Sequence, residues 1–165
     1  MRVIGLAGWS GAGKTTLLCR LIPALIGRGL RVSTLKHAHH AFDVDKPGKD
    51  SFLHREAGAT EVLIGSAGRW ALMHELRGEA EPELPALLAR MSPVDLVLVE
   101  GFKRAGHRKI EVHRAVVGKP LLHPDDPTIV AVAADPVLAA AIPSVALGDV
   151  EAVVALVLRH AQDWP

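Results

Sequence analysis

The sequence predicts an α/β fold built around a mainly parallel sheet. Short apolar runs rich in Val and Ile alternate along the chain with segments of helical periodicity, which is the order expected of strand–helix units. The run 94–99, VDLVLV, is apolar on both faces, as in a central strand that is covered on both sides. The length of 165 residues fits one domain, so we expect residues 1–165 to form a single domain.

The beginning of the chain is predicted to form a strand, a helix and a second strand. The apolar run 3–7 ends at glycines, which is typical of a buried strand entering a turn. Apolar residues then recur on one face of 14–28, which predicts a helix, and Gly27 and Gly29 end it. Residues 31–37 predict the second strand.

The middle of the chain is predicted to form a hairpin and two short helices. The stretch 38–50 is polar and has little apolar periodicity, and loops of this length are more often functional than idle. A helix is expected over 51–57. A glycine-rich turn separates the apolar runs 60–66 and 69–75, which predicts a β-hairpin, and an acidic connection leads into a helix over 84–91.

The remainder of the chain again alternates strands and helices. Strands are predicted at 94–99, 110–113, 128–134 and 144–147, and helices at 136–141 and 150–160. The segment 102–119 carries six cationic side chains against one acidic one. We expect this basic segment to be a solvated face or to attract an acidic ligand or partner.

Composition excludes several classes of protein. Lys and Arg number 19 against 18 for Asp and Glu, a net charge of +1, so general nucleic-acid binding is not expected. The single cysteine, Cys19, cannot form an intrachain disulfide. No apolar run is long enough for a membrane span, and a motif follows the first strand too closely for a signal peptide. We therefore expect a soluble, cytoplasmic protein that binds neither nucleic acid nor membrane.

Residues 8–15, GWSGAGKT, match the phosphate-loop pattern G-x-x-x-x-G-K-[ST] between a strand and a helix. Backbone N–H groups in such a loop point at phosphate oxygens, and the helix dipole favours the same anion. Lys14 would reach the β- and γ-phosphates, and the Thr15 hydroxyl would bind Mg²⁺. The loop predicts a three-layer P-loop NTPase fold with a β-hairpin addition, and a nucleotide site formed by Ser10, Gly11, Ala12, Gly13, Lys14, Thr15 and Thr16.

A second metal ligand is expected at the end of a neighbouring strand. Glu100 follows the strongest strand directly and precedes Gly101, so it lies at the ligand-binding edge of the sheet. We expect Glu100 to hold the metal with Thr15, although a solvated strand end is the alternative. Asp95, at the opposite end of the strand, is a poor candidate.

A histidine- and aspartate-rich stretch, KHAHHAFDVD, follows the second strand. Lys36 and His37, with the histidines at 39 and 40, are expected to neutralise a phosphate or a second anion. Asp43 and Asp45 are candidate catalytic residues that would orient an attacking water. The alternatives are a transition-metal site at the histidines and a solvated loop.

Two further residues each admit two interpretations. Trp9 would cover the phosphate loop by packing, or stack on a ligand, and packing is favoured. Asp135 would accept hydrogen bonds from guanine, or cap a helix that begins at Pro136, and the cap is favoured. The base preference is not set by any motif.

Four stretches together resemble the molybdopterin-guanine dinucleotide biosynthesis adapter family, which is related to the metal-chaperone branch of P-loop GTPases. They are GWSGAGKTTLL (8–18), KHAHHAFDVDKPGKDS (36–51), AGATEVLIGSAGRWALM (57–73) and DLVLVEGFK (95–103). The stretch that ends in PGKDS is far more specific than the phosphate loop. The tail after about Arg114 carries no diagnostic motif.

The resemblance implies a GTP-binding adapter with Mg²⁺, weak or no GTPase activity and a homodimeric state. It implies that residues 11–16 bind phosphate and that Thr15 and Glu100 hold the metal. It also implies a partner, the molybdenum cofactor guanylyltransferase that joins GMP to molybdopterin, and leaves open whether molybdopterin binds directly. A small-molecule P-loop kinase and a nickel- or zinc-handling GTPase are the alternative functions.

Overall fold

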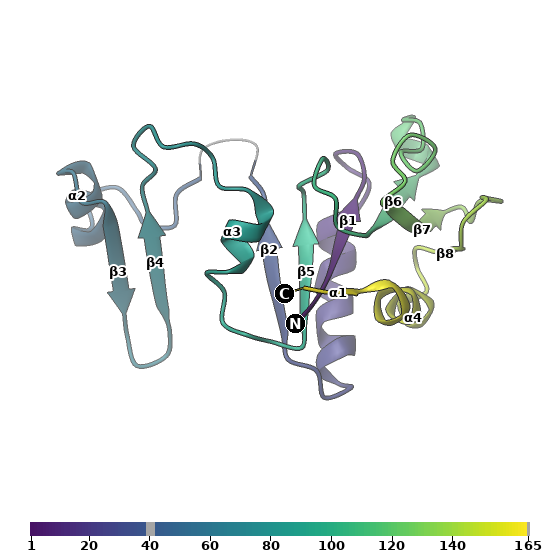
Figure 1. Cartoon of the computed structure of the whole chain (residues 1–165), viewed down its shortest axis with the longest axis horizontal. Coiled ribbons are helices and arrows are strands. Elements are labelled where there is room, and N and C mark those ends of the chain that lie inside the picture. The colour runs from purple at the N-terminus through teal and green to yellow at the C-terminus, as the bar shows by residue number, and fades with distance from the viewer. Residues whose placement is uncertain (39–41, 165) are drawn as a thin grey trace. The chain divides into compact units, whose positions relative to one another are not determined.

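The structure, a computed structural model, describes residues 1–38 and 42–164 (Figure 1). The histidines at 39 and 40, predicted as anion or metal ligands, lie outside the described residues. Contacts within the chain group it into two compact units, one formed by Met1–His37 with Leu88–Pro165 and the other by Ala38–Leu87. Each unit is described by itself below.

The larger unit is built on one sheet with the strand order β2-β5-β1-β6-β7-β8. Neighbouring strands along this order are parallel, and β9 pairs antiparallel with the start of β1. Their bounds are β1 Arg2–Ala7, β2 Val32–Lys36, β5 Leu96–Glu100, β6 Lys109–Arg114, β7 Ile129–Asp135, β8 Ser144–Ala146 and β9 Gln162–Asp163. The predicted mainly parallel sheet is confirmed.

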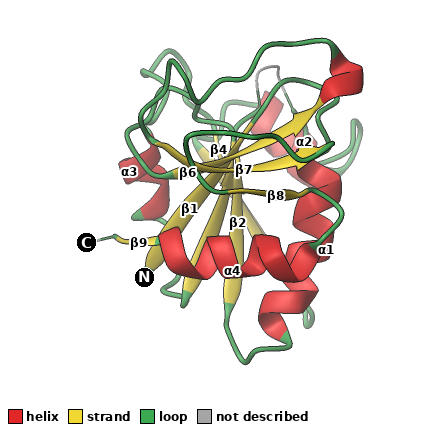
Figure 2. Cartoon of the chain, turned by 90° about the vertical axis from the view of Figure 1, so that its right-hand side faces the viewer, coloured by secondary structure: helices red, strands yellow, loops and turns green. Residues whose placement is uncertain are grey.

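One face of this sheet is covered by α1 (Lys14–Ile26) and α4 (Val150–His160), which pack against each other. Figure 2 shows α4 running across the strands. Alternate strand residues such as Leu6, Leu98 and Ile110 form a buried cluster with apolar residues of both helices. The side chain of Asp149 caps α4 by accepting a hydrogen bond from the amide of Ala152. Burial of these apolar faces fixes the turn between β1 and α1.

The opposite face of β6 carries buried polar side chains at alternate positions, Lys109, Glu111 and His113. The carboxylate of Glu111 accepts hydrogen bonds from the amides of Leu122 and His123 at 2.7 and 3.0 Å. The loop that follows β6 and its 3₁₀ turn η1 (Ala115–Val117) is thereby attached to the sheet.

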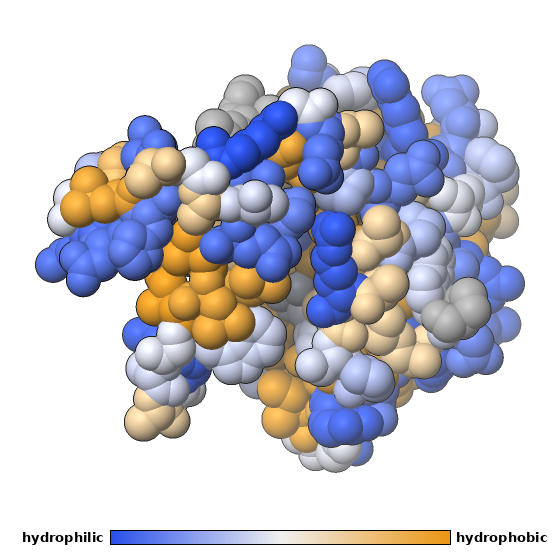
Figure 3. All heavy atoms as spheres, turned by 60° about the vertical axis from the view of Figure 1, so that its left-hand side comes forward, coloured by the Kyte–Doolittle hydropathy of each residue, from blue (hydrophilic) through white to orange (hydrophobic). Residues whose placement is uncertain are grey.

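The smaller unit consists of α2 (Asp50–Glu56) and the antiparallel hairpin of β3 (Glu61–Gly65) and β4 (Trp70–His74), so the predicted hairpin is confirmed. Leu63 and Leu72 pair across the hairpin and are 65% and 48% exposed. Figure 3 shows hydrophobic side chains at the surface on the side of the molecule that it brings forward. The hairpin therefore has an uncovered apolar face.

The helix predicted over 136–141 is wrong, because these residues are a loop between β7 and β8. Six residues form little more than one helical turn, which is stable only when an apolar face packs, and Val137 is 54% exposed. The helix predicted over 84–91 is shorter, α3 at Leu84–Leu88. None of the described helices is both long and apolar enough to cross a membrane.

Candidate nucleotide-binding site

The predicted phosphate loop connects β1 to α1 at the carboxyl edge of the parallel sheet. Gly8 begins it with a φ of +150°, and a Cβ at this position would lie 2.5 Å from the carbonyl oxygen of Val112. Only glycine fits there, because the loop runs against the backbone of β6. Ala12 is buried, whereas Ser10, Gly11, Thr15 and Thr16 are exposed. The outer side of the loop is thus open to a ligand.

Lys14, the first residue of α1, folds back over the loop. Its Nζ donates hydrogen bonds to the carbonyl oxygens of Gly8 and Trp9 at 2.9 and 3.0 Å. Burial lowers the pKa of Lys14, and the neighbouring cations Lys103 and Lys36 lower it further, whereas Glu100 acts in the opposite direction. Several cations thus gather at one edge of the sheet, where an anion would relieve their repulsion.

The two predicted metal ligands lie next to each other. The hydroxyl of Thr15 donates to Glu100 Oε1 at 3.1 Å, and the Glu100 side chain is only 12% exposed. Strand register accounts for this contact, because Glu100 lies beside Leu6 of β1 on one side and Lys36 of β2 on the other. Lys36 Nζ lies 4.0 Å from Glu100 Oε2.

His37, also predicted at this edge, is held beside β5. Its backbone amide donates to the carbonyl oxygen of Glu100 at 2.8 Å. Its ring lies against that of Phe102, with 4.6 Å between centroids. Lys36 and His37 therefore belong to the same strand-end cluster as Thr15 and Glu100.

Asp43 and Asp45 lie in the smaller unit, where Arg55 of α2 holds both carboxylates. Arg55 Nη2 is 3.1 Å from Asp43 Oδ1 and 3.1 Å from Asp45 Oδ1, and Arg55 Nε is 3.7 Å from Glu75 Oε1. The Asp45 side chain is 2% exposed. This network joins the polar stretch to the hairpin, and a role in orienting water stays a prediction.

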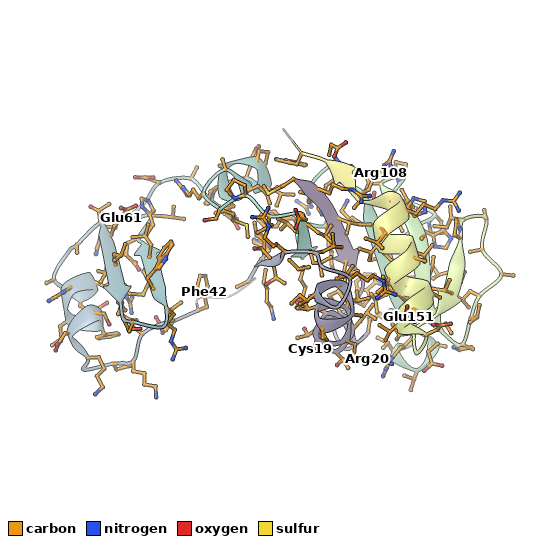
Figure 4. The ribbon with its side chains drawn as sticks, turned by 90° about the horizontal axis from the view of Figure 1, so that it is seen from below. Cys19, Arg20, Phe42, Glu61, Arg108 and Glu151 are labelled. Carbon is orange, nitrogen blue, oxygen red and sulfur yellow. The ribbon has the colours of Figure 1, made fainter. Side chains whose placement is uncertain are left out.

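A hollow of about 90 Å³ lies beside the first turn of α1. Its lining includes Gly13, Thr16, Arg20, Arg114 and Asp135. Figure 4 labels Arg20 on α1, and its guanidinium donates to the carbonyl oxygen of Gly148. The preferred cap interpretation of Asp135 is wrong because β7 is followed by a loop and not by a helix, and Asp135 instead lines this hollow at the end of β7.

Trp9 packs over the phosphate loop within the protein, which is the interpretation preferred from the sequence over stacking on a ligand. Its indole Nε1 donates to the carbonyl oxygen of Pro120 at 2.8 Å. The ammonium groups of Lys103 and Lys119 lie 5.1 and 5.8 Å from its ring centroid, within reach of cation–π attraction. Part of the basic segment is therefore attached to the phosphate loop.

In the sequence, Arg114 is one of six cations of the basic segment, and no separate role is predicted for it. Its position could have indicated a place at the site. Arg114 follows the half-buried alternation of 110–113 and so ends a strand at the ligand-binding edge of the sheet. Among the described residues no group of three or more His, Cys, Asp or Glu side chains could hold a metal ion.

Comparison with known sequences points to one family. The model of "Molybdopterin guanine dinucleotide synthesis protein B" matches residues 3–135. The molybdopterin-guanine dinucleotide biosynthesis adapter protein of Escherichia coli strain K12 is 45% identical over 163 residues, which are 97% of this chain and 93% of that protein. The protein of the same name from Haemophilus influenzae is 46% identical over 124 residues, 75% of this chain and 70% of that protein.

Solved structures agree in fold. A crystal structure of molybdopterin-guanine biosynthesis protein B matches with a TM-score of 0.76 and 29% identity, covering 95% of this chain and 98% of that one. A homologue from Bacillus stearothermophilus matches with a TM-score of 0.67 and 26% identity, covering 95% of each chain. The α/β fold, the phosphate loop and the sequence matches agree, and the chain belongs to the molybdopterin guanine dinucleotide synthesis protein B family.

Proposed function

We propose that this protein is a GTP-binding adapter, with weak or no intrinsic GTPase activity, that assists the attachment of GMP to molybdopterin. The observation that carries the nucleotide part is the contact of Thr15 with Glu100, 3.1 Å apart at the mouth of a phosphate loop. The adapter part is supported by the relatives, which are named as molybdopterin-guanine dinucleotide biosynthesis adapter proteins.

The triphosphate would be held by the loop from Ser10 to Thr16. Backbone amides of this loop would donate to phosphate oxygens. Lys14 would exchange its bonds with the Gly8 and Trp9 carbonyls for the β- and γ-phosphates. Lys36, the last residue of β2, would add positive charge near the γ-phosphate, and His37 next to it would help to hold this anion.

The residues fit Mg²⁺ at Thr15 and Glu100. This ion prefers oxygen ligands, keeps several waters and usually takes only one or two protein groups together with phosphate oxygens. A hydroxyl and a carboxylate 3.1 Å apart supply two such oxygens. When bound, Mg²⁺ neutralises charge on the β- and γ-phosphates.

Asp135 supports guanine as the base. Asp135 lines the hollow with Thr16, where the proposed nucleoside would lie. A carboxylate can accept hydrogen bonds from both the ring N–H and the exocyclic amine of guanine, whereas adenine offers no such pair of donors on that edge. We therefore propose that Asp135 selects GTP over ATP.

The partner would be the guanylyltransferase that joins GMP to molybdopterin, and molybdopterin itself is a further candidate ligand. We also propose a homodimer, which the uncovered apolar face of the hairpin supports. Asp43 and Asp45 are proposed to orient water for slow hydrolysis.

The base assignment is tested by replacing Asp135 with Asn. GTP affinity should fall about tenfold to a hundredfold, since each hydrogen bond to a charged group contributes about 1.5–3 kcal/mol. XTP affinity should rise, because xanthine has a carbonyl where guanine has its amine and the Asn amide can donate to it. Calorimetric titrations of GTP, XTP and ATP with Mg²⁺ measure this exchange.

Lys14→Ala is the matched control, because it removes a phosphate contact and should weaken GTP and XTP alike. If Asp135→Asn binds GTP as tightly as the parent, Asp135 does not read the base. The adapter part is tested by adding the protein to the purified guanylyltransferase with molybdopterin and GTP. Faster product formation, lost in Lys14→Ala, supports it, and turnover that requires a small hydroxyl acceptor alone would favour a kinase.

A further inference from the structure

Arg114 ends β6 on the same side of the phosphate loop as Asp135. The two residues are register partners on neighbouring parallel strands, and both line the hollow beside α1. No ion pair joins them within residues 1–38 and 42–164. The hollow is thus bordered by a cation and an anion that are available to a ligand.

The guanidinium of Arg114 lies over the last glycine of the loop. A Cβ placed on Gly13 would be 3.5 Å from Arg114 Nε, 3.7 Å from its Cζ and 3.8 Å from its Nη2. The Nε atom is buried and has no hydrogen-bond partner in the described part of the chain. A buried donor without an acceptor is costly, so this position favours a ligand that supplies an acceptor oxygen.

We infer that Arg114 donates hydrogen bonds to the α-phosphate of the bound nucleotide. This inference rests on the proposed function, in which Lys14 binds the β- and γ-phosphates and Asp135 binds the base. Arg114 lies between these two ends, since its guanidinium is near the open side of Gly13 and it borders the hollow with Thr16 and Asp135. A guanidinium can present two parallel N–H groups to one phosphate, which gives it geometric specificity as well as charge.

The neighbouring Arg20 does not have the same role. Its Nη2 donates to the carbonyl oxygen of Gly148 at 2.9 Å, so this guanidinium is engaged with the backbone after β8. Of the two described cations of the hollow, Arg114 is therefore the one with a donor, Nε, that lacks an acceptor among the described residues. Its contact should not depend on the γ-phosphate, on Mg²⁺ or on the base.

The test compares Arg114→Gln with the parent by calorimetry. GTP and GDP should both lose about tenfold to a hundredfold in affinity, with and without Mg²⁺. Sulfur in place of a non-bridging α-oxygen accepts hydrogen bonds poorly, so one diastereomer of guanosine 5′-O-(1-thiotriphosphate) should bind the parent more weakly than GTP does. In Arg114→Gln that difference should disappear, which loss of structure alone would not produce.

Arg108→Gln is the matched control, because Arg108 is an exposed arginine just before β6. It lies well apart from Arg20 of α1, which lines the hollow (Figure 4). Arg114→Lys keeps the positive charge but lacks the two parallel N–H groups of the guanidinium, so it should bind GTP more tightly than Arg114→Gln and more weakly than the parent. Unchanged GTP and GDP affinity in Arg114→Gln, or an undiminished thio effect, would overturn the inference and leave the proposed function standing. A parent protein that binds no nucleotide would overturn both.

Discussion

In the proposed function, Glu100 exchanges a hydrogen bond for a metal ion. Its carboxylate accepts from Thr15 at 3.1 Å and has Lys36 Nζ at 4.0 Å. With only 12% of the side chain exposed, the carboxylate depends on these partners more than on water. A cation between Thr15 and Glu100 would replace the hydrogen bond by two oxygen ligands without moving α1 or β5.

We expect Glu100→Ala to weaken GTP binding about tenfold or more when Mg²⁺ is present, and to strengthen it slightly in EDTA. The reason is that the carboxylate contributes through the metal and, without it, would only repel the phosphates. Calorimetric titrations in the two buffers measure the difference. Asp95→Ala is the control, because Asp95 precedes the other end of β5 and pairs with Arg31. Equal losses with and without Mg²⁺ would remove Glu100 from the metal site.

His107 is a buried histidine whose ring makes no hydrogen bond within the described part of the chain. It is 1% exposed, and neither ring nitrogen has a hydrogen-bond partner among the described residues. A Cβ on Gly5 of β1 would lie 2.3 Å from its Nε2, so the ring occupies the space that this glycine leaves. Burial, with a smaller contribution from the Lys109 ammonium and against the opposing effect of Asp126, lowers the pKa of His107 to about 4. The ring is therefore neutral at physiological pH.

We predict that the free energy of unfolding falls as the pH is lowered from 6.5 toward 4. The unfolded chain binds a proton near pH 6.5 and the folded chain only near 4, so the stabilisation is complete above 6.5 and is lost within this window. The difference approaches about 3 kcal/mol. Urea unfolding at several pH values measures it. His107→Gln should flatten the profile and His160→Gln should flatten it less, whereas a full slope in His107→Gln would contradict the assignment.

At the scale of single elements, the sequence predicted those features that depend on residues close to one another in the chain. The phosphate loop and α1 follow from glycines and a helical apolar face within residues 8–26. The pairing of Thr15 with Glu100 was also predictable, because parallel strands bring their carboxyl ends to one edge. These features depend on local sequence and one rule of topology.

The elements that were missed depend on contacts distant in sequence. The loop at 136–141 has helix-forming alanines and a proline at its start, but no buried surface receives it. The basic segment 102–119 was expected to act as one face, whereas Lys109 is 1% exposed and donates to the carbonyl oxygen of Ala105. Charge alone does not reveal which cations are structural, because that depends on the acceptors that the fold brings to each one.

At the scale of the whole molecule, the hairpin is the feature whose apolar side chains remain exposed in a single chain. Leu63 and Leu72 face each other across β3 and β4, with Trp70 on the same face and 68% exposed. An isolated hairpin is marginal in water unless its apolar face is covered, and contiguous exposed apolar side chains mark interaction sites. A second copy of the chain, as the proposed homodimer requires, would cover this face.

We therefore expect Leu72→Lys to convert the dimer to a monomer. In a two-fold symmetric interface the substitution occurs twice, and each lost leucine contact is worth about 1.5–3 kcal/mol, so the dimer dissociation constant should rise at least about a hundredfold. Sedimentation velocity over a range of concentrations measures it. Ile26→Lys is the control, because Ile26 is 54% exposed at the last turn of α1 and should leave the dimer intact. A monomeric parent would refute the homodimer, and a dimer that survives Leu72→Lys would place the interface away from the hairpin face.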